Sequence, residues 1–551
     1  MGSGLKMDIL KQKVCKKENI YDSVFALILS VSAVCMTRTS FDGNLWNGSI
    51  DGTYINKFGI SAVILGILLF IIFRIVLHII DEPIMNFFKN IAPEGQIKQN
   101  KKKILYLWFA IIFVAWLPYY LSYYPGGVYA DTLRSIEYVQ AGILTNRHPF
   151  FYTKVIGFFM KAGDVLGKDL NWSLGAFTAI QMLVLELEFI YFISWMLRNK
   201  IKDSIRIMFS LFFIFFPLIP LYAVSVWKDT PFCMAVLFWM MFVVSLYLEI
   251  CDGKYNFKTF AGFLTGAFLT AFTRNNGIYI VAISVFVLIL VLYKNDYVCK
   301  KIKRKVIYNS IVSVVIIFFI QGIVYDTLGI MQTDGVENFG IPLQQIGAVV
   351  AYDGVVTDEQ KEFINNFIPY EKVREIYVPT TVDSLKWDVE FNGKYLAEHK
   401  FESAKLWLQL LIQNPSIYVQ SYMLATLGFW NVDISEGGAY VQNYVWENNL
   451  GIVQTDYFQK WFGFSFQHFV NPRRCISCAW FFWIFFFMAW FLMKHYGWRS
   501  VFLFIPQLGV WITLMIAVPV AVSLRYIAAN MFTLPFIIIV PLLIYRNKNF
   551  K

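Results

Sequence analysis

The sequence predicts an all-α polytopic membrane protein with about twelve transmembrane helices, interfacial helices in its first large outer loop and a mainly α extracytoplasmic domain. Of its 551 residues, 58% are hydrophobic, 19% are aromatic and only 15% are charged, and the mean hydropathy is +0.54. These values lie outside the range of soluble globular proteins. A lipid bilayer is therefore the expected environment.

About twelve stretches are apolar enough, at roughly 20 residues each, to cross a bilayer. Their approximate limits are 22–38, 58–80, 104–121, 174–197, 207–222, 231–249, 259–273, 278–293, 308–325, 476–493, 500–519 and 527–545.

The formal net charge of +11 comes mainly from lysines and arginines in alternate connections between these stretches. They precede 22–38, follow 58–80, 174–197 and 278–293, and recur near the C-terminus. Because basic loops stay in the cytoplasm, both termini are expected to be cytoplasmic in a multi-pass protein of the cell membrane. The basicity is thus a topology signal, and no nucleic-acid partner is expected.

Three parts follow from this topology. Residues 1–325 form an N-terminal transmembrane module with a large outer loop at 122–173, residues 326–475 form an extracytoplasmic domain, and residues 476–551 form the C-terminal transmembrane helices. The second part has the composition of a soluble protein.

Two helical patterns lie inside the predicted extracytoplasmic domain. One covers Asp358–Arg374, and the other covers Phe401–Phe429 with a break at Asn414-Pro415. Proline ends or kinks a helix, so the second pattern predicts two helices.

The outer loop contains YYPGGVYADTLRSIEYVQAGILTNRHP, residues 123–149. Its Pro-Gly-Gly turn predicts a sharp change of direction, after which apolar residues recur at helical spacing from Asp131. A second, more apolar interfacial segment covers 150–166. This arrangement would hold the Asp131 carboxylate beside the lipid headgroups.

Polar groups that interrupt the hydropathy pattern gather on the predicted outer side. Charged side chains are costly inside a bilayer, so their clustering at one surface indicates a site. Lys228, Arg274 and Arg525 are candidate ligands for a phosphate group. Further candidates in the same outer segments are Tyr129, Arg134, His148, Asp229, Asn275 and Tyr526.

Several candidates also have a simpler structural explanation. Asp131 follows a glycine turn and could cap a helix. His148 could be an ordinary loop residue, Lys228 and Asp229 could neutralise each other, and Arg525 could extend to the interface. The sequence leaves these alternatives open.

No nucleotide-binding glycine loop, HExxH or GxSxG motif occurs in a suitable context. This disfavours a nucleotide-driven pump and an intramembrane zinc protease.

Six short patterns carry a resemblance: YPGGVYADT followed by HP, then VWKDTPF, TRNNG, and NPSIY with GFW. Over roughly 100–530 they resemble a family of uncharacterised bacterial membrane proteins related to the GT-C-fold glycosyltransferases. The number of spans, the first-loop aspartate and the late outer domain are similar to that superfamily. The resemblance implies an enzyme that takes sugar from a polyprenyl-phosphate donor, with Asp131 at the position of the catalytic aspartate.

Several members of that superfamily have an Asp-Glu or Asp-x-Asp pair in the first loop. Here Ala130 precedes Asp131 and Leu133 lies two residues beyond it. This departure leaves dependence on Mg²⁺ or Mn²⁺ open, with Asp131 and Asp229 as the candidate metal ligands.

The expected function is transfer of a sugar, with inversion, to a cell-envelope polysaccharide, lipid or protein on the extracytoplasmic face. Asp131 would remove the proton from the acceptor hydroxyl, and the three cations would stabilise the departing phosphate. One alternative is a polymerase or ligase of lipid-linked oligosaccharides, which would depend on His148 and the arginines. Another is a transporter or flippase, although such proteins typically have two similar halves with broken helices.

Overall fold

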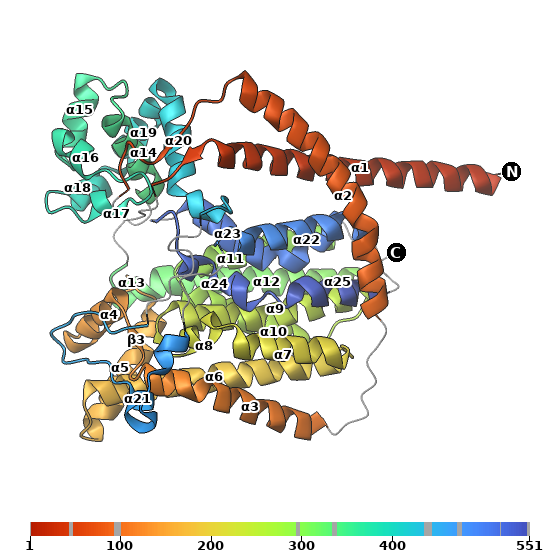
Figure 1. Ribbon diagram of the computed structural model, residues 1–551, viewed down its shortest axis with the longest axis horizontal. Helices are drawn as coiled ribbons and strands as arrows, with labels where there is room; N and C mark the ends of the chain where they lie inside the picture. The colour runs from red at the N-terminus through yellow and green to blue at the C-terminus, as the bar shows by residue number, and fades with distance from the viewer. Residues whose placement is uncertain are drawn as a thin grey trace.

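A bundle of long helices carries two lobes at one end in the computed structural model (Figure 1). The structure describes residues 2–42, 48–92, 101–293, 298–332, 339–434, 443–470, 477–517 and 520–547. Within these residues the chain is mostly helical, and the named strands form only two short pairs. The prediction of an all-α membrane protein is confirmed at this level. We call the end with the lobes, at the left of Figure 1, the site end.

The bundle consists of helices that run along its length, some of them as two successive segments such as α24 and α25. They are α3 Lys101–Ser122, α6 Leu170–Arg198, α7 Asp203–Phe215, α9 Asp229–Cys251, α10 Phe257–Thr273, α11 Gly277–Tyr293, α12 Lys300–Phe319, α22 Trp480–Tyr496, α23 Ile505–Ile516, α24 Leu524–Phe532 and α25 Phe536–Arg546. Two further helices, α1 Gly2–Thr37 and α2 Ile60–Ile91, form a hairpin at its side, joined by the strands β1 Thr39–Ser40 and β2 Tyr54–Ile55.

Eight helices of the described chain are long and apolar enough to cross a membrane. They are Ile20–Thr37, Ile60–Ile91, Lys101–Ser122, Leu170–Arg198, Asp229–Cys251, Lys300–Thr327, Trp498–Ile516 and Leu524–Arg546. The other four predicted spans fall on α7, α10, α11 and α22, which have 13 to 17 residues. The length and apolar composition of these eight helices therefore indicate a membrane-embedded protein. The number of twelve membrane crossings remains a prediction.

Prolines set several helix limits. The predicted span 207–222 is divided at Pro217, where α7 gives way to the short helix α8 Leu218–Ala223. The predicted helix Asp358–Arg374 is wrong as a single unit, because Pro369 separates α15 Asp358–Asn365 from α16 Tyr370–Ile376. The predicted break at Pro415 is confirmed.

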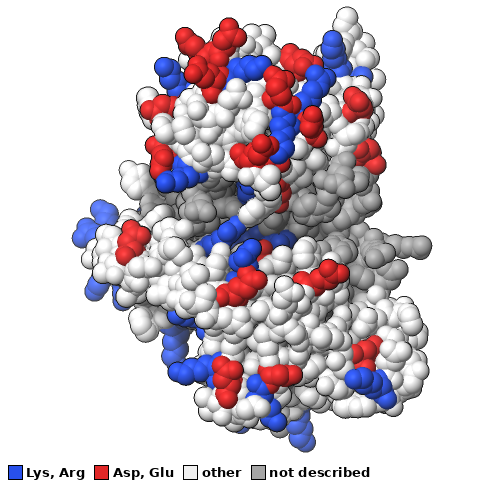
Figure 2. Space-filling view, turned by 90° about the vertical axis from the view of Figure 1, so that its left-hand side faces the viewer, with Lys and Arg blue, Asp and Glu red and all other residues white. Residues whose placement is uncertain are grey.

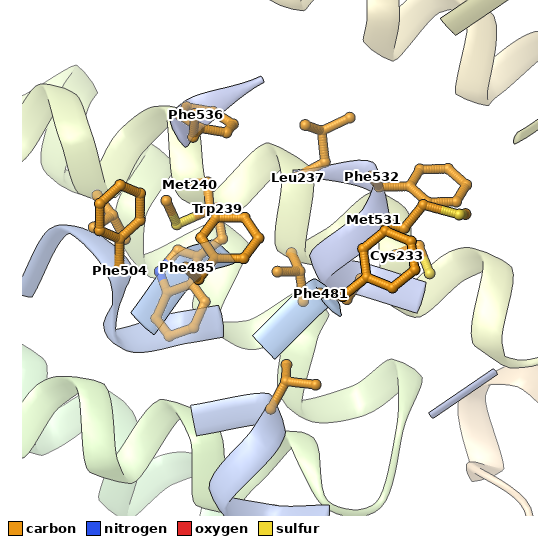
Figure 3. Packing of buried hydrophobic residues seen from close by; sticks show 14 of the residues in the cluster. Cys233, Leu237, Trp239, Met240, Phe481, Phe485, Phe504, Met531, Phe532 and Phe536 are labelled. Carbon is orange, nitrogen blue, oxygen red and sulfur yellow. The ribbon is translucent and has the colours of Figure 1, made fainter. Parts of the chain in front are cut away.

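Helix α9 lies at the centre of the bundle, and it is apolar on all sides. Figure 3 shows its Trp239 and Met240 packed near Phe485 of α22 and Phe536 of α25. All four side chains are buried. A helix without a polar face is suited to such a position, and in lipid its association depends on close packing.

The helical lobe, at the upper left of Figure 1, has a hydrophobic core of its own. It contains α14 Gly340–Ala351, α15, α16, α17 Asp383–Lys386, α18 Gly393–Glu398, α19 Lys400–Gln413 and α20 Pro415–Ala425. Leu343, Val349, Ile364 and Leu410 are among its buried residues. This part of the predicted extracytoplasmic domain is therefore helical.

The loop lobe contains β3 Gly127–Val128, α4 Ala130–Gln140 and α5 Phe150–Val165. Residues 443–470 cover it, since the Trp446 N–H donates to the Val128 carbonyl (3.0 Å) and the Thr455 N–H donates to the Tyr124 carbonyl (2.7 Å). The late part of predicted domain 326–475 thus packs on the first loop. The predicted boundary at 475 lies outside the described residues.

Candidate active site

Six ionisable side chains from distant parts of the sequence meet at the site end. We call them the site cluster: Asp131, His148, Lys228, Asp229, Arg274 and Arg525. They come from α4, the loop before α5, the α8–α9 connection, the start of α9, the end of α10 and the start of α24. Figure 2 views this end and shows Lys and Arg side chains in the hollow between the two lobes.

A short parallel pair of strands joins the loop lobe to the start of α9. Strand β3 pairs with β4 Ser225–Val226, and the Thr132 hydroxyl donates to the Val226 carbonyl. Gly126 precedes this pair with φ +124°, and a Cβ there would lie 2.6 Å from the Thr178 hydroxyl oxygen. Only glycine fits such a turn, which brings Asp131 within reach of Lys228.

The Asp131 carboxylate lies between two cations. Its Oδ2 is 3.1 Å from Lys228 Nζ and 2.6 Å from an Arg525 guanidinium nitrogen. Tyr129 is the N-cap of α4, so Asp131 stands in the first turn and uses its side chain for the ion pairs. The side chain remains 28% exposed, so this carboxylate faces the open side of the cluster.

Asp229 is the buried counterpart, with 0% of its side chain exposed. It lies 3.2 Å from an Arg274 guanidinium nitrogen and 3.3 Å from Arg525 Nε. Arg525 therefore bridges both carboxylates through different nitrogens. The ion pair of Lys228 is with Asp131, and those of Asp229 are with the two arginines.

Aromatic rings enclose the arginines. The Arg525 guanidinium lies over Trp227 (4.7 Å to the centroid) and Tyr526 (5.0 Å), and Arg274 lies over the same Tyr526 ring (5.0 Å). Such stacking fixes the guanidinium planes. Trp227, which also packs on Tyr129, was not among the predicted site residues, although its position directly before Lys228 was a usable signal.

His148 contacts the cluster through Lys228. Its Nδ1 lies 2.9 Å from Lys228 Nζ, and the residue is buried. Burial, followed by the Lys228 charge, lowers the pKa of His148 to about 3. The imidazole is therefore neutral near pH 7, and its Nδ1 accepts a hydrogen bond from the ammonium group.

The charges around Asp131 determine its protonation. Burial alone would raise the pKa of the Asp131 carboxyl, but Lys228 and Arg525 outweigh it and hold the pKa well below its usual range. Burial lowers the pKa of Lys228, while Asp131 opposes that effect. Asp131 is consequently ionised at neutral pH.

The remaining predicted residues lie at different distances from the cluster. Tyr526 stacks on both arginines, and the Tyr129 hydroxyl bonds to Ser225 Oγ (3.2 Å). The Asn275 amide donates to the Asn146 carbonyl (2.9 Å), two residues before His148. Arg134 is 58% exposed and pairs with Glu137 at 2.8 Å on the face of α4, so it is not part of the cluster.

The two carboxylates do not form a suitable metal site. Both contact Arg525, and each has a second cation beside it. Within the described residues, no group of three His, Cys, Asp or Glu side chains could hold a metal ion. Since Mg²⁺ and Mn²⁺ require several oxygen ligands, Asp131 and Asp229 do not fit the predicted metal role.

The helical lobe reaches the site through residues 380–387. The Ala521 N–H donates to the Thr380 carbonyl (2.8 Å), which ties the lobe to the segment before Arg525. The Arg147 guanidinium lies over the Trp387 ring at 5.1 Å. Trp387 is exposed, so an aromatic face borders the hollow next to His148.

Charge balance indicates what the cluster can bind. Among the described residues, the ion pairs of these three cations, Lys228, Arg274 and Arg525, are with two carboxylates, and His148 is neutral, so the paired groups carry one more positive than negative charge. Guanidinium groups bind phosphate oxygens through paired hydrogen bonds. The arrangement therefore suits an anionic group placed beside an ionised, partly exposed carboxylate.

Of three comparisons with known proteins, one found a match, to a protein family. The model of a family described as a family of unknown function (DUF6020) matches residues 138–549. No curated protein matches the chain, and no solved structure matches it.

Proposed function

Because the chain belongs to the family of unknown function DUF6020, we propose its activity from the site cluster: a membrane glycosyltransferase that uses a polyprenyl-phosphate sugar. The acceptor is a polysaccharide, lipid or protein of the bacterial cell envelope. One observation carries the proposal, namely the ionised, 28% exposed Asp131 held between Lys228 and Arg525. The resemblance to the GT-C superfamily supports the choice of donor.

The donor phosphate occupies the positive side of the cluster. It takes over Lys228 and Arg525 as partners, and this exchange releases Asp131 from the ion pairs that hold its pKa down. Donor binding thereby makes Asp131 a stronger base. A base whose pKa rises toward the working pH transfers protons more effectively.

Transfer then needs one base and one stabilised leaving group. Asp131 accepts the proton of the acceptor hydroxyl while that oxygen bonds to the anomeric carbon of the sugar. The bond from this carbon to the phosphate oxygen breaks, its electron pair stays on the phosphate, and the anomeric configuration inverts. Lys228, Arg274 and Arg525 stabilise the negative charge on the departing lipid phosphate.

Asp229 serves a different purpose from Asp131. Its side chain is fully buried and touches both arginines, so it orients them without meeting the substrate. A buried carboxylate of this kind holds the guanidinium groups ready before the phosphate arrives. Substitution of Asp131 is therefore expected to lower the rate of the chemical step. Substitution of Asp229 is expected to weaken donor binding and folding.

The test is turnover of polyprenyl-phosphate sugars by the purified protein in proteoliposomes. Asp131→Asn keeps the size of the side chain and removes the base, so kcat should fall by about 10²–10⁴-fold. KM for the donor should not rise, because the cations lose a competing carboxylate. The matched control is Asp164→Asn, an exposed aspartate on α5, which should retain wild-type turnover.

Near-wild-type turnover by Asp131→Asn would refute the base assignment. Failure of the folded protein to consume any donor of this class would refute the proposed function itself.

A ligase or polymerase of lipid-linked oligosaccharides is the second candidate. The observation that favours it is His148, buried 2.9 Å from Lys228 beside the arginines. Such an enzyme would consume an oligosaccharide on lipid pyrophosphate and would lose activity with His148→Asn more than with Asp131→Asn. The transferase should show the reverse order.

We also propose twelve membrane crossings in a GT-C-like arrangement, with both termini cytoplasmic and the site on the extracytoplasmic face. Support comes from α7, α10, α11 and α22, which lie in the same bundle as six of the eight longer helices. Single cysteines near each terminus should react only with membrane-permeant thiol reagents in intact cells. Labelling of either terminus by an impermeant reagent would contradict this topology.

A further inference from the structure

A surface groove of about 540 Å³ lies between α10 and α12, toward the end of the bundle opposite the site. Arg274, at the site, follows the last residue of α10, so the groove begins at the other end of that helix. Its walls include Phe257, Leu264 and Phe268 of α10. These side chains repeat at helical spacing and make an apolar floor.

One end of the groove is polar. Lys305 and Asn309 lie four residues apart on α12, hence on one face, and Tyr255 precedes α10. Lys305 Nζ lies 4.6 Å from the centre of the Tyr255 ring. Within the described part of the chain, the Tyr255 hydroxyl is buried and has no hydrogen-bond partner.

The nearby acidic groups leave the Lys305 charge available. Glu249 accepts a hydrogen bond from the Thr259 hydroxyl (2.7 Å), and Asp252 pairs with Lys254 at 3.2 Å. Among the described residues, Lys305 forms a cation–π contact and no ion pair. The Lys305 ammonium group thus lies over the Tyr255 ring at the polar end of an apolar groove.

We propose that this groove binds one anionic membrane phospholipid, with an acyl chain along α10 and its phosphate at Lys305. The wall from Phe257 to Leu269 rises about 18 Å at 1.5 Å per residue, close to the roughly 15 Å depth of one leaflet's hydrocarbon. Basic pockets between transmembrane helices bind anionic headgroups in this way. The volume is also that of an ordinary ligand site.

Charge complementarity decides the occupant. Lys300, Lys301, Lys303 and Arg304 lie close to Lys305 in sequence at the start of α12, so the headgroup end of the groove is strongly basic. A zwitterionic lipid would satisfy the apolar wall but not this charge. The site is independent of glycosyl transfer, and its failure would leave the proposed function intact.

The test is native mass spectrometry of the full-length protein from mixed micelles containing phosphatidylglycerol or phosphatidylcholine. Wild type should retain one phosphatidylglycerol in preference to phosphatidylcholine. Lys305→Gln should weaken that retention about fivefold, the effect of one basic residue at an anionic surface. Lys168→Gln, at an exposed lysine after α5 in the loop lobe, is the matched control and should keep it.

A second variant tests the apolar half. Ala261→Phe narrows the groove while leaving Lys305 in place, and it should also reduce retention. Equal retention of both lipids by wild type, or equal losses with Lys305→Gln and Lys168→Gln, would overturn the proposal. So would unchanged phosphatidylglycerol binding by both Lys305→Gln and Ala261→Phe in folded protein.

Discussion

Two clusters of charged side chains in this protein have opposite designs. The site cluster is drawn from six segments and keeps one carboxylate, Asp131, 28% exposed. The second, which we call the clasp cluster, joins α1, α2 and α22 through Asp22, Arg74, Asp81, Lys494 and His495. In the clasp the central pair is almost fully buried, with Lys494 5% and Asp22 6% exposed.

The clasp balances its charges, whereas the site does not. Lys494 lies 3.1 Å from Asp22 and 2.9 Å from Asp81, and Arg74 adds a second cation to Asp22. Two carboxylates thus meet two permanent cations. A balanced, closed cluster fastens a helix hairpin to the bundle, while an open cluster with excess positive charge attracts an anion.

Breaking the clasp should give the largest loss of stability. Lys494→Met leaves Asp22 and Asp81 without their shared ammonium, and removing one partner of a buried pair costs about 3–5 kcal/mol. Thermal unfolding in detergent measures this loss. Lys258→Met, an exposed lysine at the start of α10, is the control and should stay close to wild type.

This variant also sharpens the comparison of the two clusters. Donor turnover per folded molecule of Lys494→Met should remain at the wild-type level, because the clasp touches no site residue in the described contacts. A specific loss of turnover without unfolding would show that the clasp has a catalytic role.

Arg525→Lys should produce the opposite result. Arg525 reaches Asp131 and Asp229 through two different nitrogens, a fork that a lysine ammonium cannot reproduce. We expect kcat for donor consumption to fall by about 10²–10³-fold, as when one charge-stabilising donor is removed from an active site. Arg374→Lys, in an exposed pair on the helical lobe, is the control.

Unchanged kcat in folded Arg525→Lys would mean that Arg525 is structural, and the distinction between the two clusters would fail.

Sequence reasoning selected charged residues that the structure brings together, but it did not predict how they pair. Asp131, Lys228, Arg274 and Arg525 could be selected because charges at span ends are costly and therefore noticeable. The sequence did not show that Asp229 pairs with the two arginines and Lys228 with Asp131. These pairings depend on the β3–β4 strand pair and on the position of α24. Two-residue strands have no periodic sequence signal.

Arg134 shows the reverse error. It was a candidate because it lies in the same outer segment as Asp131, but Glu137, three residues further on, is its ion-pair partner. Likewise, the packing of residues 443–470 on the first loop rests on main-chain bonds such as Thr455 to Tyr124. Every residue type except proline can donate such bonds, so they leave no sequence signal, and composition assigned this segment to the late domain.

The pH dependence of stability should reveal a smaller contribution of the site cluster, through the buried imidazole of His148. Burial holds the pKa of His148 at about 3, against a usual value of 6.5. Between these values the unfolded chain binds more protons, so stability contributed by the neutral ring is complete above pH 6.5 and declines as the pH falls toward 3. Asp131 also has a lowered pKa, and its effect on stability appears only as the pH falls below the usual carboxyl value of 3.8. A comparison between pH 4.5 and 7 therefore reports on His148.

His148→Asn keeps a hydrogen-bond acceptor for Lys228 but cannot titrate. Its melting temperature should therefore fall less between pH 7 and 4.5 than that of wild type. Identical slopes for the two proteins would contradict a neutral, buried His148. Variant Gln413→Asn, at an exposed position in the helical lobe, supplies the control, and its slope should follow wild type.

The smallest effect is expected for Arg134→Gln, which tests whether a residue close to Asp131 but outside the site cluster takes part in donor binding or catalysis. Arg134 is on the same short helix as Asp131, yet it is 58% exposed, and it forms a surface ion pair with Glu137 at 2.8 Å. Exposed pairs contribute about 0–1 kcal/mol, so the melting temperature and donor kcat should both stay near wild type. If Arg134→Gln instead raised KM for the donor as strongly as Arg525→Lys lowers kcat, the phosphate would have to extend along α4, and the boundary of the site cluster would need to include this helix face.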